Sequence, residues 1–86
     1  MKLVRWNELK SARLKRTRGV SFDEISQAIF IDVVEHHARP GERLLLFEHK
    51  NYVWVVPFVE NDRELFLKTL YPSRKYTKLY RRGRWR

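Results

Sequence analysis

Basic and tyrosine side chains are interleaved near the end of the chain, in a pattern typical of contacts to phosphates and bases. The segment RKYTKLY, residues 74–80, combines both kinds of group. A guanidinium binds two phosphate oxygens at once, and a phenol ring stacks on a base or donates a hydrogen bond. A solvated basic helix is the competing interpretation. The candidates in this region are Arg74, Lys75, Tyr76, Lys78, Tyr80, Arg81 and Arg82, and Trp85 in the tail is a further candidate contact.

A single lysine lies within an apolar stretch shortly before this segment. Lys68 falls between Phe66 and Leu70, on one face of a predicted strand. An ammonium group is unusual there unless its stem covers apolar surface or its head meets a bound substrate. Both interpretations stay open, and Lys68 is a candidate site residue.

Two adjacent histidines form the next candidate. Histidine exchanges a proton near neutral pH, so either His36 or His37 could act as an acid or a base. In an extended segment their side chains point to opposite faces, so one of them at most faces a given site, and we take His36. A surface histidine is the alternative. We expect no metal site and no cofactor, because the chain has no cysteine and His49 is the remaining histidine.

The first predicted helix, from Asn7 to about Thr17, carries several cations. We expect Lys10, Arg13 and Arg16 to contact phosphates rather than to transfer protons, because arginine is always protonated and nothing in the sequence lowers the pKa of a lysine here.

The charge of the whole chain also indicates an anionic partner. Nineteen Lys and Arg side chains against ten Asp and Glu give a net charge of +9. Residues 1–20 hold seven basic and one acidic side chain, residues 21–64 hold four and nine, and residues 65–86 hold eight and none. We expect the two basic ends to fold together into one cationic face, with an acidic surface behind it.

Length and composition restrict the architecture. Eighty-six residues form one domain, 1–86, because a chain of this size has surface enough for a single core. No apolar run approaches the roughly 20 residues needed to cross a bilayer, and the first residues lack the apolar centre of a secretory signal. These observations predict a cytoplasmic protein without disulfides.

The elements that position the candidates are predicted from periodicity and capping signals. Leu3 to Trp6 is apolar like a strand, and Ser21 with Glu24 forms a capping box that begins a second helix with an apolar face through Ile29. Three antiparallel strands and a short helix capped by Ser73 follow. We expect an α+β domain in which two N-terminal helices pack on one face of a four-stranded, mainly antiparallel sheet. The predicted later elements are strands 43–48, 52–60, with Pro57 at a bulge or a lost hydrogen bond, and 65–71, then a helix over 74–80.

Two segments resemble the BrnT-like toxins of bacterial toxin–antitoxin modules, which share the RelE-like fold. The first, residues 5–24, matches the family's opening pattern, although Arg18 stands where better-known members have histidine. The second, residues 70–80, is similar to the stretch that follows the family's last strand. The matching positions of the first segment are Trp6, Asn7, Lys10, Gly19, Val20, Phe22 and Glu24.

This resemblance implies a toxin that inhibits translation as an endoribonuclease. It further implies a cognate antitoxin, commonly a ribbon-helix-helix protein, which would bind operator DNA as part of a toxin–antitoxin complex such as a heterotetramer. RNA cleavage without a metal needs groups that transfer protons and cations that hold the developing negative charge. The alternatives are a non-catalytic basic nucleic-acid-binding protein and a co-repressor subunit. The catalytic candidates are Lys68, Arg74, Lys75, Tyr76 and His36.

Overall fold

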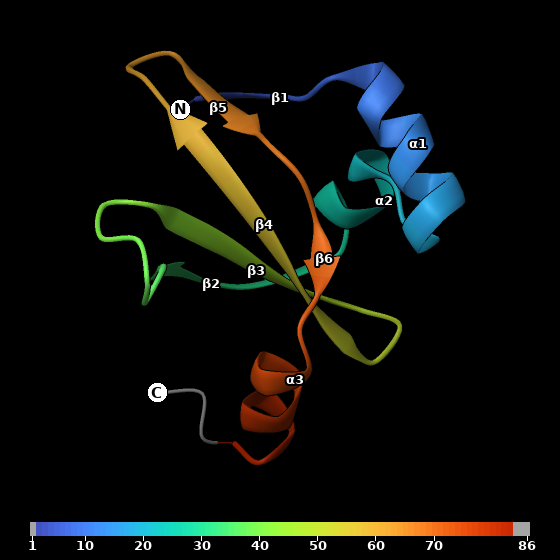
Figure 1. Ribbon diagram of the computed structural model, residues 1–86, viewed down its shortest axis with the longest axis vertical. Coiled ribbons are helices and arrows are strands. Elements are labelled where there is room, and N and C mark those ends of the chain that lie inside the picture. Colours follow the sequence, from blue (N-terminus) through green and yellow to red (C-terminus); the bar gives the residue numbers. More distant parts are fainter. Residues whose placement is uncertain (1, 84–86) are drawn as a thin grey trace.

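The longest apolar segment forms the central strand of a mixed sheet in the computed structural model, which describes residues 2–83 (Figure 1). This strand, β4 (Tyr52–Glu60), is buried from Val53 to Phe58 because it is apolar on both faces. The sheet order is β1-β5-β4-β3-β2, and β6 also pairs with β4. The other strands are β1 (Leu3–Arg5), β2 (Ile29–Glu35), β3 (Arg43–His49), β5 (Glu64–Leu67) and β6 (Tyr71–Pro72).

The turn between β3 and β4 aligns these two strands. Lys50 and Asn51 have positive φ angles of 53° and 65°, as a two-residue type I′ hairpin requires. Antiparallel pairing joins β2 to β3, β3 to β4 and β4 to β5, whereas β1 lies parallel to β5. The predicted antiparallel succession of strands is confirmed.

A β-bulge interrupts the strand beside the last part of β4. Phe58 pairs with Leu67 and Val55 pairs with Tyr71, so the three residues 68–70 lie opposite the two residues 56–57. Pro57 cannot donate to this side of the ladder, although its carbonyl accepts a hydrogen bond from the Lys68 N–H at 2.9 Å. Of the two alternatives predicted for Pro57, the lost hydrogen bond is therefore found in β4, and the bulge lies in the neighbouring segment 68–70.

Helices α1 (Glu8–Arg18) and α2 (Phe22–Ser26) pack on one face of the sheet. Asn7 caps α1, and Gly19 ends it at a φ of 81°. The capping box of Ser21 and Glu24 is present at the start of α2. The core of this face joins the two helices to the sheet, and its members include Leu14, Val20, Phe22, Ile25, Trp54, Val56 and Leu70.

Helix α3 (Arg74–Arg81) packs on the opposite face, capped by Ser73. Thr77, which is 3% exposed, fixes it to β4: its Oγ1 accepts from the Val53 N–H at 2.9 Å and donates to the Ser73 carbonyl at 2.6 Å. Tyr76 and Tyr80 pack against the buried residues of this face, which include Leu46 and Val53.

The predicted strand count and the length of the second helix are wrong. α2 ends at Ser26, and the chain continues as the edge strand β2, in which Ile29 is 62% exposed. The β-branched residues of IFIDVV favour a strand, and this preference outweighs the helical spacing of the residues before it. The sheet of the described residues thus has six strands rather than four. None of the helices within residues 2–83 is long and apolar enough to span a bilayer.

The expected single cationic face is present only in part, because α1 and α3 pack on opposite faces of the sheet. α1 contributes Leu14 to the core on one side of the sheet, and α3 contributes Tyr76 and Tyr80 to the other side. Figure 1 accordingly shows α1 at the upper right and α3 at the bottom. The two basic helices are separated because the side chains that each of them buries, Leu14 of α1 and the two tyrosines of α3, pack against different faces of the sheet.

We predict that Thr77→Val destabilises the protein by about 2 kcal/mol, because the buried Val53 N–H would lose its acceptor while the side-chain volume stays nearly constant. Urea unfolding measures the change. The control is Thr17→Val on the exposed surface of α1, which we expect to change stability by less than about 0.5 kcal/mol. Equal effects of the two changes would contradict an anchoring role for Thr77.

We also predict that stability depends on pH through Glu24. The hydrogen bond from Lys15, with Nζ 2.6 Å from Oε1, lowers the pKa of Glu24 from 4.5 to about 2. A lowered carboxyl pKa stabilises the fold above pH 4.5, and this contribution disappears as the pH falls from 4.5 towards 2. Glu24→Gln should therefore be less stable than the wild type at neutral pH, and urea unfolding should show the difference shrinking in acid. A constant difference would contradict this prediction.

Candidate functional site

Three neighbouring hollows lie next to the bulge and to the beginning of α3. The central hollow, of about 350 Å³, is lined by Lys10, His36, Arg39, Glu42, Lys68 and Tyr71, together with Pro57 and Thr69. An outer hollow of about 410 Å³ shares Glu42 and Lys68 with it. An aromatic hollow of about 160 Å³ shares His36 and Tyr71 with it and continues to Ser73, Lys75 and Tyr76. The three hollows are therefore neighbours, and we call them together the concave surface.

The bulge determines which side chains enter this surface. Leu67 and Leu70 are both buried in the core under α1 and α2, although regular alternation would put them on opposite faces. The extra residue in the bulge restores Leu70 to the core and brings Tyr71 to the other face, where it lines the central hollow with Lys68. The expectation that Lys68 shares a strand face with Leu70 is wrong for this reason. Lys68 is exposed at the hollow, and Leu70 is fully buried.

His36 enters the central hollow from the turn that joins β2 to β3. Its backbone N–H donates to the Glu42 carbonyl at 2.8 Å, and its Nδ1 accepts from the Ala38 N–H at 3.1 Å. A ring nitrogen that accepts a hydrogen bond carries no proton, so the neutral imidazole presents its N–H at Nε2. His36 is thus held as a hydrogen-bond donor.

The two histidines do not point to opposite faces as expected. The rings of His36 and His37 are stacked, with centroids 5.4 Å apart and an interplanar angle of 12°, and both line the aromatic hollow. β2 ends at Glu35, so the alternation of an extended strand does not apply to the turn that follows.

The central hollow carries excess positive charge. Across residues 2–83, no carboxylate forms an ion pair with Lys10 or Lys68. Arg39 and Glu42 pair with each other at 3.5 Å. Two lysines near one concavity repel each other unless an anion lies between them, so the site favours a negatively charged ligand.

Tyr71 supplies a neutral hydroxyl to the same place. Partial burial raises the pKa of its phenol, which therefore keeps its proton and can donate it. Tyr80 differs because its hydroxyl donates to Glu48 Oε1 at 3.1 Å, and this hydrogen bond raises its pKa most. The Tyr80 side chain therefore has a structural role, because it links α3 to β3.

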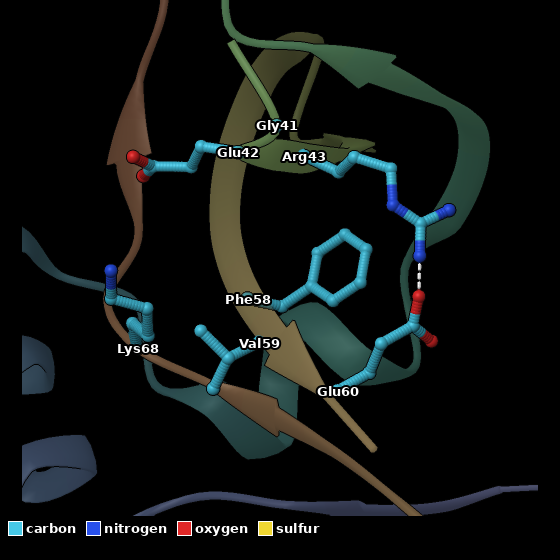
Figure 2. A pocket seen from close by; sticks show the side chains of 7 residues that line it. All are labelled: Gly41, Glu42, Arg43, Phe58, Val59, Glu60 and Lys68. Carbon is cyan, nitrogen blue, oxygen red and sulfur yellow. Dashed lines mark ion pairs between the residues drawn. The ribbon is translucent and has the colours of Figure 1, made fainter. Parts of the chain in front are cut away.

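The outer hollow is more nearly neutral. Figure 2 shows Glu42 and Lys68 on one side of it and the ion pair of Arg43 with Glu60 on the other. The Arg43 guanidinium lies over the Phe58 ring, 5.3 Å from its centroid. The Arg43 guanidinium is therefore already neutralised by Glu60. The positive charge of the outer hollow that has no acidic partner among the described residues is that of Lys68.

Several candidates from the sequence lie away from these hollows. Arg74 is exposed at the first position of α3, and Arg81 donates to the Asn51 carbonyl at 2.6 Å. Trp85 lies outside the described residues. The other candidates that line none of the three hollows are Arg13, Arg16, Lys78, Tyr80 and Arg82.

Three ionisable residues of the central hollow were not predicted from the sequence. Arg39 and Glu42 flank Pro40-Gly41 in the turn that also carries His36. Two opposite charges on either side of a turn, close to a histidine, could have indicated a polar site at this turn. No pattern indicated Tyr71, because its orientation depends on the bulge. Lys10, His36 and Lys68 are brought together at the central hollow, and Lys75 and Tyr76 at the adjoining aromatic hollow.

Comparison with known proteins adds nothing to this geometry. No protein family, curated protein or solved structure matches the chain. The resemblance to the BrnT-like toxins rests on residues 5–24 and 70–80. The residues of the central hollow themselves indicate its chemistry: they combine two lysines without an acidic partner among the described residues, a neutral phenol, a carboxylate and an imidazole N–H.

Proposed function

We propose that this protein is an endoribonuclease toxin that cleaves single-stranded RNA without a metal and thereby inhibits translation. The observation that carries the proposal is the central hollow, where Lys68, His36 and Tyr71 line one space of about 350 Å³ together with Glu42. A phosphodiester placed there would meet cations, hydrogen-bond donors and a proton acceptor at once. Phosphoryl transfer needs these three kinds of group.

The residues divide naturally between the steps of cleavage. The 2′-oxygen of the RNA attacks the neighbouring phosphorus, and the bond from phosphorus to the 5′-oxygen breaks, which leaves a 2′,3′-cyclic phosphate and a 5′-hydroxyl. The Glu42 carboxylate takes the 2′-hydroxyl proton, and the Tyr71 phenol gives its proton to the 5′-oxygen. Proton exchange with water then restores both groups.

The remaining groups stabilise the charge that develops on the phosphate. Lys68 and Lys10 supply positive charge, and the His36 Nε2–H donates a hydrogen bond. We assign His36 this role instead of the predicted proton transfer, because a proton leaving Nε2 of the imidazolium would leave one on Nδ1, facing the Ala38 N–H.

The resemblance described above agrees with this location. The first resembling segment contributes Lys10 to the central hollow, and the second contributes Tyr71, Ser73 and Lys75 to the hollows. We therefore keep the RelE-like arrangement as part of the proposal, together with a cognate antitoxin, commonly of the ribbon-helix-helix type, that would cover the cationic hollow. Such a toxin acts on RNA in the cytoplasm.

A non-catalytic nucleic-acid-binding protein or co-repressor subunit is the second candidate. The exposed cations of α1 and α3 that line none of the three hollows favour it, because such cations can bind phosphates without any proton transfer. Both candidate functions include nucleic-acid binding, but only the first includes RNA cleavage.

We predict that binding of a single-stranded oligonucleotide weakens with salt, and that Lys68→Ala reduces the slope of log K against log salt by about 0.7. A 2′-deoxy oligonucleotide avoids cleavage, and fluorescence anisotropy measures affinity. The matched control is Arg63→Ala, which removes one positive charge from the turn between β4 and β5, outside the hollows. Equal slopes for Lys68→Ala and the wild type would place the bound phosphate elsewhere.

We predict that Glu42→Gln and Tyr71→Phe each slow RNA cleavage about 100-fold, because each removes a proton-transfer group with little change in shape. Gel analysis of a short RNA measures the rate, and growth after induction in a bacterial host measures toxicity. Tyr52→Phe, on a tyrosine outside the hollows, is the control for Tyr71→Phe. Wild-type protein that binds RNA but leaves it intact would instead support the non-catalytic candidate.

A further inference from the structure

We infer that the aromatic hollow binds one unpaired keto base, guanine or uracil, next to the phosphate held in the central hollow. This inference rests on the proposed function and adds a base preference to it. Neither charge nor the resembling segments specify such a preference, so it must come from the shape and chemistry of this hollow.

The walls of the aromatic hollow suit a flat ring. Leu44 and Val55, which are 3% and 1% exposed, give it an apolar floor. Tyr71 and Tyr76 line it together with the stacked rings of His36 and His37. Bases that are splayed out of single-stranded RNA stack on such aromatic side chains.

The polar groups of the hollow are mainly donors. The Ser73 hydroxyl oxygen accepts from the Tyr76 N–H at 3.1 Å, which leaves its O–H to donate. The Lys75 ammonium lies 5.6 Å from the centroid of the Tyr76 ring. The His36 Nε2–H is a third donor, and the lining has no carboxylate or amide side chain.

Donors select bases whose edges carry acceptors. Guanine presents O6 and N7, and uracil presents O4, whereas adenine and cytosine place an amino donor at the corresponding position. An amino group facing the Lys75 ammonium would leave both donors without a partner, which is costly in a partly buried site.

The aromatic hollow lies next to the central hollow. His36 and Tyr71 line both the aromatic and the central hollow, so a base in one is adjacent to a phosphate in the other. The unpaired Lys68 belongs to the central hollow and Lys75 to the aromatic hollow, so phosphate binding and base binding can be tested separately.

The test is a titration of the full chain with inorganic phosphate and with the four nucleoside 3′-monophosphates, followed by NMR of amide and aromatic side-chain signals. We expect the guanosine and uridine compounds to bind about tenfold more tightly than inorganic phosphate, as one stacked base contributes. They should also bind about fivefold more tightly than the adenosine and cytidine compounds. Equal affinity for all four nucleotides, or for phosphate alone, would overturn the inference.

Two variants locate the effect. Lys75→Met should remove most of the keto preference, and His37→Ala should weaken all four nucleotides while leaving inorganic phosphate unchanged. Arg63→Met, which removes the same charge from a turn outside the hollows, should retain the preference. A preference that survives Lys75→Met would contradict the assigned donor.

Cleavage separates this inference from the proposed function. RNA that is cut with no preference for guanine or uracil, by a protein whose Lys68→Ala variant is inactive, would overturn the base site and leave the ribonuclease standing. Keto-selective binding without any cleavage would overturn the ribonuclease and leave the base site intact.

Discussion

The concave surface depends on one mismatch in the sheet, the extra residue that the chain inserts between β5 and β6. Pro57 offers no N–H to its neighbour, so the ladder is weakened where residues 68–70 face residues 56–57. The bulge keeps both Leu67 and Leu70 in the core. It also places Lys68 and Tyr71 on the opposite side, where a regular strand would separate them. Burial of Leu67 and Leu70 therefore determines the positions of Lys68 and Tyr71 at the central hollow.

Anchoring of α3 completes the surface. Thr77 ties the helix to β4 through a buried hydrogen bond, and Tyr80 ties it to Glu48 on β3. Because both contacts are on the inner side of the helix, Lys75 and Tyr76 come to the aromatic hollow at its beginning. The same contacts explain why Tyr80 and Arg81, equally plausible from their types, are used for structure.

The distribution of charge has a similar explanation. Several exposed acids are paired with cations, as in Lys2 with Glu60, Arg5 with Glu64 and Lys15 with Glu24. These pairs neutralise cations that composition alone would assign to a ligand. The net positive charge therefore overstates the cations that remain for the hollows, where Lys10 and Lys68 are unpaired with any acid among the described residues.

The amino-acid sequence by itself determined the features that depend on neighbours along the chain. The caps at Asn7, Ser21 and Ser73, the strand over 52–60 and the hydrogen bond lost at Pro57 all follow from local hydrogen bonding and periodicity. The conversion of residues 29–35 into an edge strand, the separation of α1 from α3 and the meeting of Lys10, His36, Lys68 and Tyr71 were decided only by the tertiary structure. The physical reason is that the sheet has two faces to cover: which face a side chain joins depends on register and on long-range burial, and a one-residue bulge reverses it.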